Sequence, residues 1–162
     1  MTVFDQLVQL LDSGGARYRV LEHSAEGKSD EVARIRGTAP GQGAKAMLCK
    51  PKSGAAGDDW VLAVLPGDQK LDFRKLAAAL GLPKMTLASP DEAGALTGCV
   101  MGAVPPFALV PQITLVVDPG LVQRFDEIAF NAGRLDRSMV LKSDDYLRIA
   151  QPALHAITVD AD

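Results

Sequence analysis

Lys45 lies in an otherwise apolar run, residues 44–49, which predicts a buried strand that carries a single cation. Moving an ammonium group out of water costs on the order of several kcal/mol unless the group is paired or its pKa falls. A strand that tolerates such a lysine either lines a cleft or lies at a sheet edge, where the stem packs on apolar surface and the head reaches water. Position alone leaves both interpretations open.

Segments with helical and strand-like patterns alternate along the 162 residues of the chain. Apolar residues recur at helical spacing near the N-terminus, and the alternation that follows predicts a half-buried strand. We expect helices at 3–12, 29–36, 72–80, 89–98, 119–125 and 144–149, and strands at 18–23, 44–50, 60–65, 113–117, 127–131 and 139–141. No repeat or low-complexity tract interrupts this order, so the sequence predicts one mixed α/β domain over residues 1–162.

Local signals mark several element boundaries. Ser29 and Ser143 precede acidic residues and are expected to be helix N-caps, and Ser89 precedes Pro90, a residue favoured at the first helical position. The polar, glycine-containing segment 51–59 predicts a loop that joins its flanking strands as antiparallel neighbours.

The composition is that of a compact globular protein, with 48% apolar residues and a mean hydropathy of +0.10. No apolar run approaches the roughly 20 residues that a membrane-spanning helix needs, and the N-terminus shows no export signal. Cys49 and Cys99 lie in apolar segments and are interpreted as reduced core residues. We therefore expect a cytoplasmic protein that does not bind membranes.

The net charge of −3 and the isoelectric point near 5.4 argue against a protein that coats DNA or another long nucleic acid. Such a protein would need a broad basic face. A protein that grips only one end of a nucleic acid is still compatible with this charge. Local basic residues do occur, and most of them are interpreted as solvated surface. They are Lys28, Arg34, Arg36, Lys50, Lys52, Arg134, Arg137 and Lys142.

Several apparent motifs fail on context. The glycine-rich stretch before Lys45 lacks the adjacent Gly-Lys-Ser/Thr of a phosphate-binding loop, and a strand rather than a helix follows it. The histidines and cysteines lack the spacing of a zinc site, so we expect no metal and no cofactor. Neither cysteine has a base beside it in sequence, which argues against a thiol nucleophile. His23 ends a strand, where it is either a structural hydrogen-bonding residue or part of a cleft wall.

The second informative feature is the loop Gly102-Ala103-Val104-Pro105-Pro106. Gly102 allows the backbone to approach a neighbour closely, and the two prolines restrict the chain that follows. Backbone N–H groups held in such a loop can stabilise a carbonyl or a developing oxyanion. The alternative is a rigid turn between two strands. Together with Lys45, the loop favours a functional cleft.

Three features in this order carry a resemblance to a known family: Lys45 in an apolar strand, the Gly102-x-x-x-Pro106 loop, and residues 130–134 before a strand and a final helix. Over essentially its whole length the chain resembles the YbaK/ProX-type aminoacyl-tRNA deacylases, free-standing relatives of the editing domain of bacterial prolyl-tRNA synthetase. The resemblance implies the fold of that domain, with a mixed, partly barrel-like β-sheet flanked by short helices.

The resemblance also implies a trans-editing hydrolase, in which water attacks the ester between a wrongly attached amino acid and the terminal adenosine of tRNA. Such an ester is already activated, so positioning of water and stabilisation of the oxyanion suffice. The implied catalytic groups are Lys45, which would hold the 3′-terminal region of the substrate, and the loop from Gly102 to Pro106, which would cradle the aminoacyl carbonyl. The implied substrate-binding residues are His23, Ala103, Val104, Pro105, Asn131, Gly133 and Asp136.

Residues 131–138 differ from the corresponding segment in better-known branches of the family, so we expect the pocket to accept a different amino acid. Serine, threonine and alanine are the candidates, in that order, and a small polar substrate would need specific hydrogen bonds. The expected partner is the acceptor end of aminoacyl-tRNA, and a synthetase is a second candidate. Two alternatives remain open: a non-catalytic module that binds aminoacyl-tRNA or an aminoacyl nucleotide, and a protein that docks on a synthetase.

Overall fold

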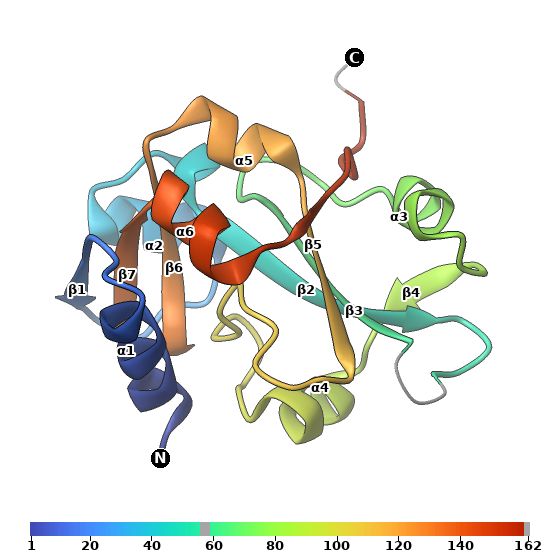
Figure 1. Ribbon diagram of the computed structural model, residues 1–162, viewed down its shortest axis with the longest axis horizontal. Helices are drawn as coiled ribbons and strands as arrows, with labels where there is room; N and C mark the ends of the chain where they lie inside the picture. Colours follow the sequence, from blue (N-terminus) through green and yellow to red (C-terminus); the bar gives the residue numbers. More distant parts are fainter. Residues whose placement is uncertain (56–58, 161–162) are drawn as a thin grey trace.

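A computed structural model describes residues 1–55 and 59–160, and its elements follow the predicted alternation of helices and strands (Figure 1). They are α1 (Val3–Ser13), β1 (Tyr18–Glu22), α2 (Ser29–Arg36), the 3-10 turn η1 (Pro40–Gln42), β2 (Ala44–Pro51), β3 (Trp60–Pro66), α3 (Phe73–Leu80), β4 (Met85–Leu87), α4 (Pro90–Thr97), β5 (Ile113–Val117), α5 (Pro119–Arg124), β6 (Glu127–Arg134), β7 (Arg137–Lys142), α6 (Ser143–Ala150) and β8 (Ala153–Leu154). The antiparallel pairing of β2 with β3 confirms the predicted hairpin, although residues 56–58 of its loop lie outside the described part.

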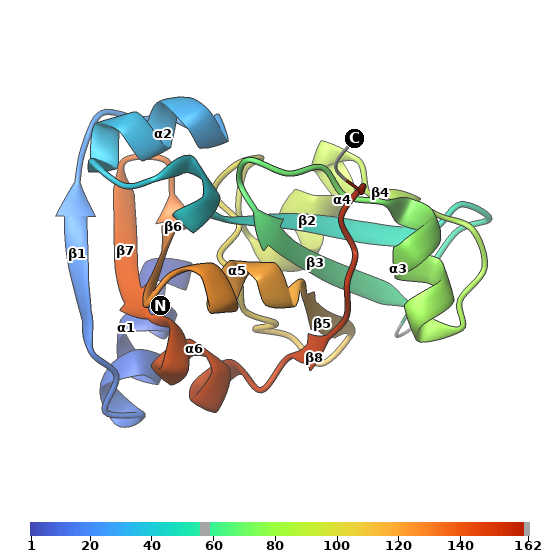
Figure 2. The ribbon, with the colours of Figure 1, turned by 90° about the horizontal axis from the view of Figure 1, so that it is seen from above.

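The strands form two sheets that lie side by side (Figure 2). The first is antiparallel, in the order β1-β7-β6, and the second is mixed, in the order β4-β2-β3-β5-β8. A bridge between Gly43 and Ala129 links the two, and η1 contacts both β3 and β6. The predicted mixed α/β fold is confirmed, but the described strands do not close into a barrel, because they divide between these two sheets.

The central strand β3 explains where the core lies. Its side chains alternate between two apolar clusters on opposite faces of the larger sheet, with Leu62 and Val64 in one and Val61 and Leu65 in the other. Helix α3 contributes Leu76 to the second cluster, whereas α1 and α5 pack on the first. A strand buried on both faces is expected to be apolar throughout, as the run at 60–65 is.

The predicted helix starts are confirmed in one case and shifted in two. Ser89 caps α4, since its hydroxyl accepts the Glu92 N–H at 3.1 Å. Ser29 and Ser143 are instead the first residues of α2 and α6, after Lys28 and Lys142. The Ser143 hydroxyl donates to the carbonyl of Phe125 at 2.8 Å, so a tertiary contact has taken the group expected to cap the helix.

A network of ion pairs ties α6 to the segment before β1. Asp145 accepts hydrogen bonds from the backbone N–H and Nε of Arg17, at 2.8 and 3.0 Å, and from Arg148 at 3.2 Å. The side-chain hydrogen bond from Arg17 is the largest of the effects that hold the pKa of Asp145 well below its ordinary value. A carboxylate with a lowered pKa stabilises the fold above its unfolded-state pKa and loses that contribution as the pH falls.

We therefore expect Asp145→Asn to lower the thermal unfolding midpoint by several degrees at neutral pH, because the amide cannot replace a carboxylate between two arginines. The difference from the unsubstituted protein should shrink as the pH falls below 3.8, the ordinary aspartate pKa. Calorimetry from about pH 7 to about pH 2 measures it. A difference that stays constant over this range would contradict the assignment.

Candidate functional site

A cleft opens between the first half of β2, the loop before α2, and the loop that contains Gly102. Its wider part has a volume of about 230 Å³ and an apolar wall that includes Leu48, Ala88 and Ala93. Its narrower part has a volume of about 60 Å³ and is lined by Gly27, Ser29, Val32, Arg36, Gly43, Ala44, Lys45, Ala46, Gly102, Val104 and Asn131. The cleft therefore has an apolar region and a small polar region that meet at Lys45.

Lys45 occupies the position that the sequence predicts, on a strand and facing a cleft. It pairs in register with Leu65 of β3, whereas β4 pairs only with residues 49–51 of β2, so the opposite side of Lys45 is open. The half-buried side chain donates from Nζ to the carbonyl of Gln69 at 2.5 Å. Burial lowers the pKa of Lys45, which shows that the ammonium is poorly solvated and poorly compensated there.

The loop around Gly102 is held rigidly by its flanks. Pro106 is buried, and its carbonyl accepts the hydroxyl proton of the buried Tyr146 at 2.6 Å. Ala103 is also buried, and its carbonyl accepts the N–H of Gly133 at 3.0 Å. In the part of the chain that the structure describes, the N–H groups of Gly102 and Val104 have no hydrogen-bond partner. Both residues line the cleft, so these N–H groups are available to an oxygen bound there.

Gly102 also brings two loops into direct contact. Its φ of +84° is a backbone conformation that L side chains rarely adopt. A Cβ atom at this position would lie 2.9 Å from the Cα of Gly27 and 3.1 Å from its carbonyl oxygen. Only a glycine therefore allows the two loops to approach this closely.

Asn131 fastens the same two loops together. Its Nδ2 donates to the carbonyls of Glu26 and Gly102, each at 2.9 Å. Its Oδ1 accepts from Arg36 Nη2 at 3.0 Å and from Ser138 Oγ at 3.1 Å. These four hydrogen bonds use the full capacity of a carboxamide. Asn131 therefore positions the walls of the cleft and has no hydrogen-bonding group left for a substrate.

Replacing Asn131 by aspartate should consequently loosen both loops, because a carboxylate cannot donate to the two carbonyls. We expect hydrogen exchange to become faster at residues 24–28 and 100–104, and substrate turnover to fall roughly 10- to 100-fold, from loss of positioning. A variant that keeps wild-type exchange rates and turnover would show that Asn131 is dispensable for the cleft.

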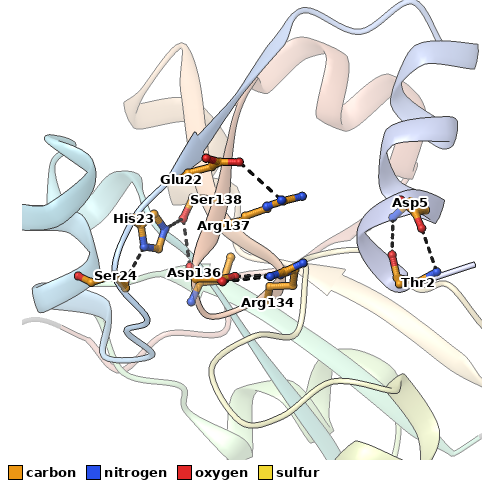
Figure 3. Close-up of polar contacts among 10 residues, drawn as sticks. Thr2, Asp5, Glu22, His23, Ser24, Arg134, Asp136, Arg137 and Ser138 are labelled. Atoms are coloured by element: carbon orange, nitrogen blue, oxygen red, sulfur yellow. Dashed lines mark hydrogen bonds and ion pairs between the residues drawn. The ribbon is translucent and has the colours of Figure 1, made fainter.

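Arg36 and His23 complete the hydrogen-bond network behind the cleft. Arg36 Nε donates to Ser138 Oγ at 2.7 Å, and His23 Nε2 lies 2.7 Å from the same oxygen. His23 Nδ1 lies 2.8 Å from the carbonyl of Ser24, which can only accept (Figure 3). Burial lowers the pKa of Arg36 to about 10. This arginine has no carboxylate partner among the described ion pairs.

The structure thus gathers four of the predicted site residues, Lys45, Gly102, Val104 and Asn131, at one cleft. The other predicted residues do not line it. His23 lies behind it, and Asp136 forms an ion pair with Arg134 at 2.9 Å (Figure 3). Gly133 packs against α1, where a Cβ atom would lie 2.8 Å from a methyl group of Val3. Ala103, Pro105 and Pro106 belong to the loop but are buried, and they are not among the residues that line the cleft.

Arg36 lines the cleft, although the sequence analysis does not single it out from the other basic residues. A local pattern could have distinguished it. Val32 is buried on α2, and Arg36 follows it by four residues, so both lie on the same face of the helix. Arg34, which lies on another face, has 76% of its side chain exposed and pairs with Glu31, as a surface residue does.

The geometry gives little support to a thiol nucleophile or to a metal site. Cys49 and Cys99 are buried and free, and burial raises the pKa of the Cys49 thiol to about 12, which disfavours a thiolate. Within residues 1–55 and 59–160, no group of three or more His, Cys, Asp or Glu side chains is placed to hold a metal ion. No helix in this part of the chain is long and apolar enough to cross a membrane.

The cleft of two parts thus brings together a half-buried lysine and a constrained loop in which two N–H groups have no partner among residues 1–55 and 59–160, an arrangement suited to binding an activated acyl group. Comparison with known proteins agrees. Residues 23–149 match the model of the aminoacyl-tRNA editing domain. The chain belongs to this family, and its activity is the deacylation of mischarged aminoacyl-tRNA.

One sequence relative and one solved structure show what the chain is similar to. It is 55% identical, over 149 residues, to the multifunctional Ser/Thr-tRNA deacylase ProXp-y of Escherichia coli, an alignment that covers 92% of this chain and 89% of the relative. Its fold matches the crystal structure of a candidate trans-editing enzyme for prolyl-tRNA synthetase with a TM-score of 0.80, 21% identity and 99% of both chains covered.

Proposed function

We propose that residues 1–162 act as one editing domain that removes serine and threonine from tRNA to which they were wrongly attached. The observation that carries the proposal is a cleft lined by Lys45 and by Gly102 and Val104, whose N–H groups have no hydrogen-bond partner among the described residues. The high identity to a Ser/Thr-tRNA deacylase supports these two amino acids as substrates. Charged tRNA is a cytoplasmic substrate, so we expect the chain to act there, with or without recruitment by a synthetase.

In the proposed reaction, a water oxygen attacks the ester carbonyl carbon. The carbonyl oxygen takes up negative charge, and the bond from that carbon to the ribose oxygen then breaks. One proton of the water ends on the departing ribose oxygen and the other goes to solvent, so the products are the free amino acid, as its carboxylate, and tRNA with a free terminal hydroxyl. The N–H groups of Gly102 and Val104 would stabilise the oxyanion, and Lys45 would hold the end of the substrate.

The wider, apolar part of the cleft suits the terminal adenosine, and the junction near Lys45 suits the small aminoacyl group. An aminoacyl ester is already activated, so orientation of water and oxyanion stabilisation can supply most of the acceleration. This explains how a cleft without an adjacent Cys-His or Ser-His pair in its lining can be catalytic.

The decisive test is release of labelled amino acid from tRNA charged with serine, threonine, alanine or cysteine, on cognate and non-cognate tRNA. We expect catalytic release of serine and threonine and slower release of alanine. Binding of these tRNAs without release would favour the non-catalytic module, and a stable synthetase complex without release would favour the docking protein.

A further inference from the structure

The Arg36 guanidinium is a partly buried charge whose hydrogen-bond partners among the described residues are neutral. Its Nε and Nη2 donate to Ser138 Oγ and Asn131 Oδ1, both of which are uncharged acceptors. No Asp or Glu appears in the lining of either part of the cleft. Removing a charge from water without a counter-charge is costly, and an arginine held in this way favours an anionic ligand.

The third nitrogen of Arg36 is available to such a ligand. Among the described residues, Nη1 has no hydrogen-bond partner, and it lies 3.7 Å from where a Cβ atom of Gly43 would stand. Because two of the three nitrogens are fixed by Ser138 and Asn131, the guanidinium plane is set before any ligand binds. A pre-oriented donor loses little entropy on binding an anion.

Lys45 adds a second positive charge to the same narrow region. Its Nζ uses one donor on the Gln69 carbonyl and, as an ammonium, carries two more. The carboxylate that most favours its charged form, Asp68, is itself paired with Arg124 at 3.1 Å. The narrow region therefore holds two cations and no lining carboxylate, and its volume of about 60 Å³ suits a small anion better than a purine base.

We propose that this region is a phosphate subsite, in which Arg36 Nη1 and Lys45 bind the phosphodiester on the 5′ side of the terminal adenosine. The inference rests on the proposed function, because that function supplies the nucleotide. The adenosine then extends into the wider apolar part, and the ester lies between the two, beside Gly102. Charge-assisted hydrogen bonds from a preset arginine are among the strongest contacts that a phosphate can make.

The contribution of the phosphate to binding can be measured with two small ligands. Adenosine 5′-monophosphate and adenosine differ only in the phosphate, and nitrogen–proton chemical-shift titrations of the whole chain detect even millimolar binding. We expect the wild-type protein to bind the monophosphate about tenfold more tightly than adenosine, which corresponds to roughly 1.4 kcal/mol. In Arg36→Gln the ratio of the two affinities should fall to about twofold or less.

The control and a second variant keep the test interpretable. Arg34→Gln removes a charge from the same helix outside the cleft and should leave the preference for the monophosphate intact. Arg36→Lys keeps the positive charge but loses the planar guanidinium with its several donors, so its preference should be intermediate. The same titrations report whether each variant is folded. A wild-type protein without the preference, or a folded Arg36→Gln that retains it, would overturn the subsite.

Turnover separates this proposal from the proposed function. Absence of serine release by the wild-type protein would count against the deacylase alone, since the titrations need no turnover. With release established, Arg36→Gln should raise the KM for seryl-tRNA and reduce the slope of log affinity against log salt by about 1. If Arg36→Gln instead lost discrimination between serine and alanine while keeping its preference for the monophosphate, the arginine would bind the side-chain hydroxyl, and the phosphate assignment would be wrong.

Discussion

Replacing Lys45 by alanine is expected to leave a folded protein that has lost most of its deacylase activity. Loss of one positioned electrostatic donor at a reacting centre typically costs about 10²- to 10³-fold in turnover, and we expect a fall of at least about 10²-fold. The fold should survive because burial already disfavours the Lys45 ammonium, as its lowered pKa shows. Removing a poorly solvated charge relieves a cost and leaves only the Gln69 carbonyl without its donor.

The matched control is Lys50→Ala on the same strand. Lys50 pairs with Glu92 at 2.7 Å and does not line the cleft, so its loss should change turnover less than about twofold, as expected for a partly exposed ion pair. Single-turnover release of serine from mischarged tRNA gives the rates, and circular dichroism checks folding. Wild-type rates in a folded Lys45→Ala protein would remove Lys45 from the site.

The strand of Lys45 and the loop of Gly102 could be predicted because their signals are local. A single cation in an apolar run, and a glycine followed by two prolines, each restrict the chain within a few residues. What the sequence could not show is that β2 leaves Lys45 unpaired on one side, because β4 is a three-residue strand with no clear pattern of its own. The cleft lies at that edge because β4, a neighbouring strand distant in sequence, is too short to reach Lys45.

The difference between local signals and contacts distant in sequence also explains what could be predicted of Asn131 and of the two sheets. Asn131 could be associated with the site, but its role depends on carbonyls 105 and 29 residues away, which no local pattern reveals. Its saturation by four hydrogen bonds makes it a residue that positions the loops, and not one that contacts substrate. Likewise, strand patterns predicted a mixed fold but not its division into two sheets, because pairing is decided by tertiary contacts.

Gly102→Ala is expected to be nearly as damaging as Lys45→Ala, for a steric reason. The new Cβ atom would stand 2.9 Å from the Cα of Gly27, a backbone atom that cannot turn aside. Either the Gly102 loop or the loop of Gly27 must move, and both are fastened by Asn131. A displacement of about 1 Å at a positioned donor can cost on the order of 10²-fold in rate, and we expect a loss of that size.

Gly81→Ala is the control that separates the steric contact with Gly27 from the strain of a left-handed backbone. Gly81 ends α3 at a φ of +62°, close in type to the +84° of Gly102, but a Cβ atom there would meet nothing within 4 Å. Gly81→Ala should therefore lose about 1 kcal/mol of stability from the left-handed backbone alone, measured by urea unfolding, and keep its turnover. Gly102→Ala should lose more stability, because the contact with Gly27 adds to the backbone strain, and it should also lose turnover. Equal turnover in the two variants would mean that the approach of Gly102 to Gly27 does not set the geometry of the oxyanion site. A large loss confined to Gly102→Ala would tie catalysis to the placement of the backbone N–H groups beside Lys45.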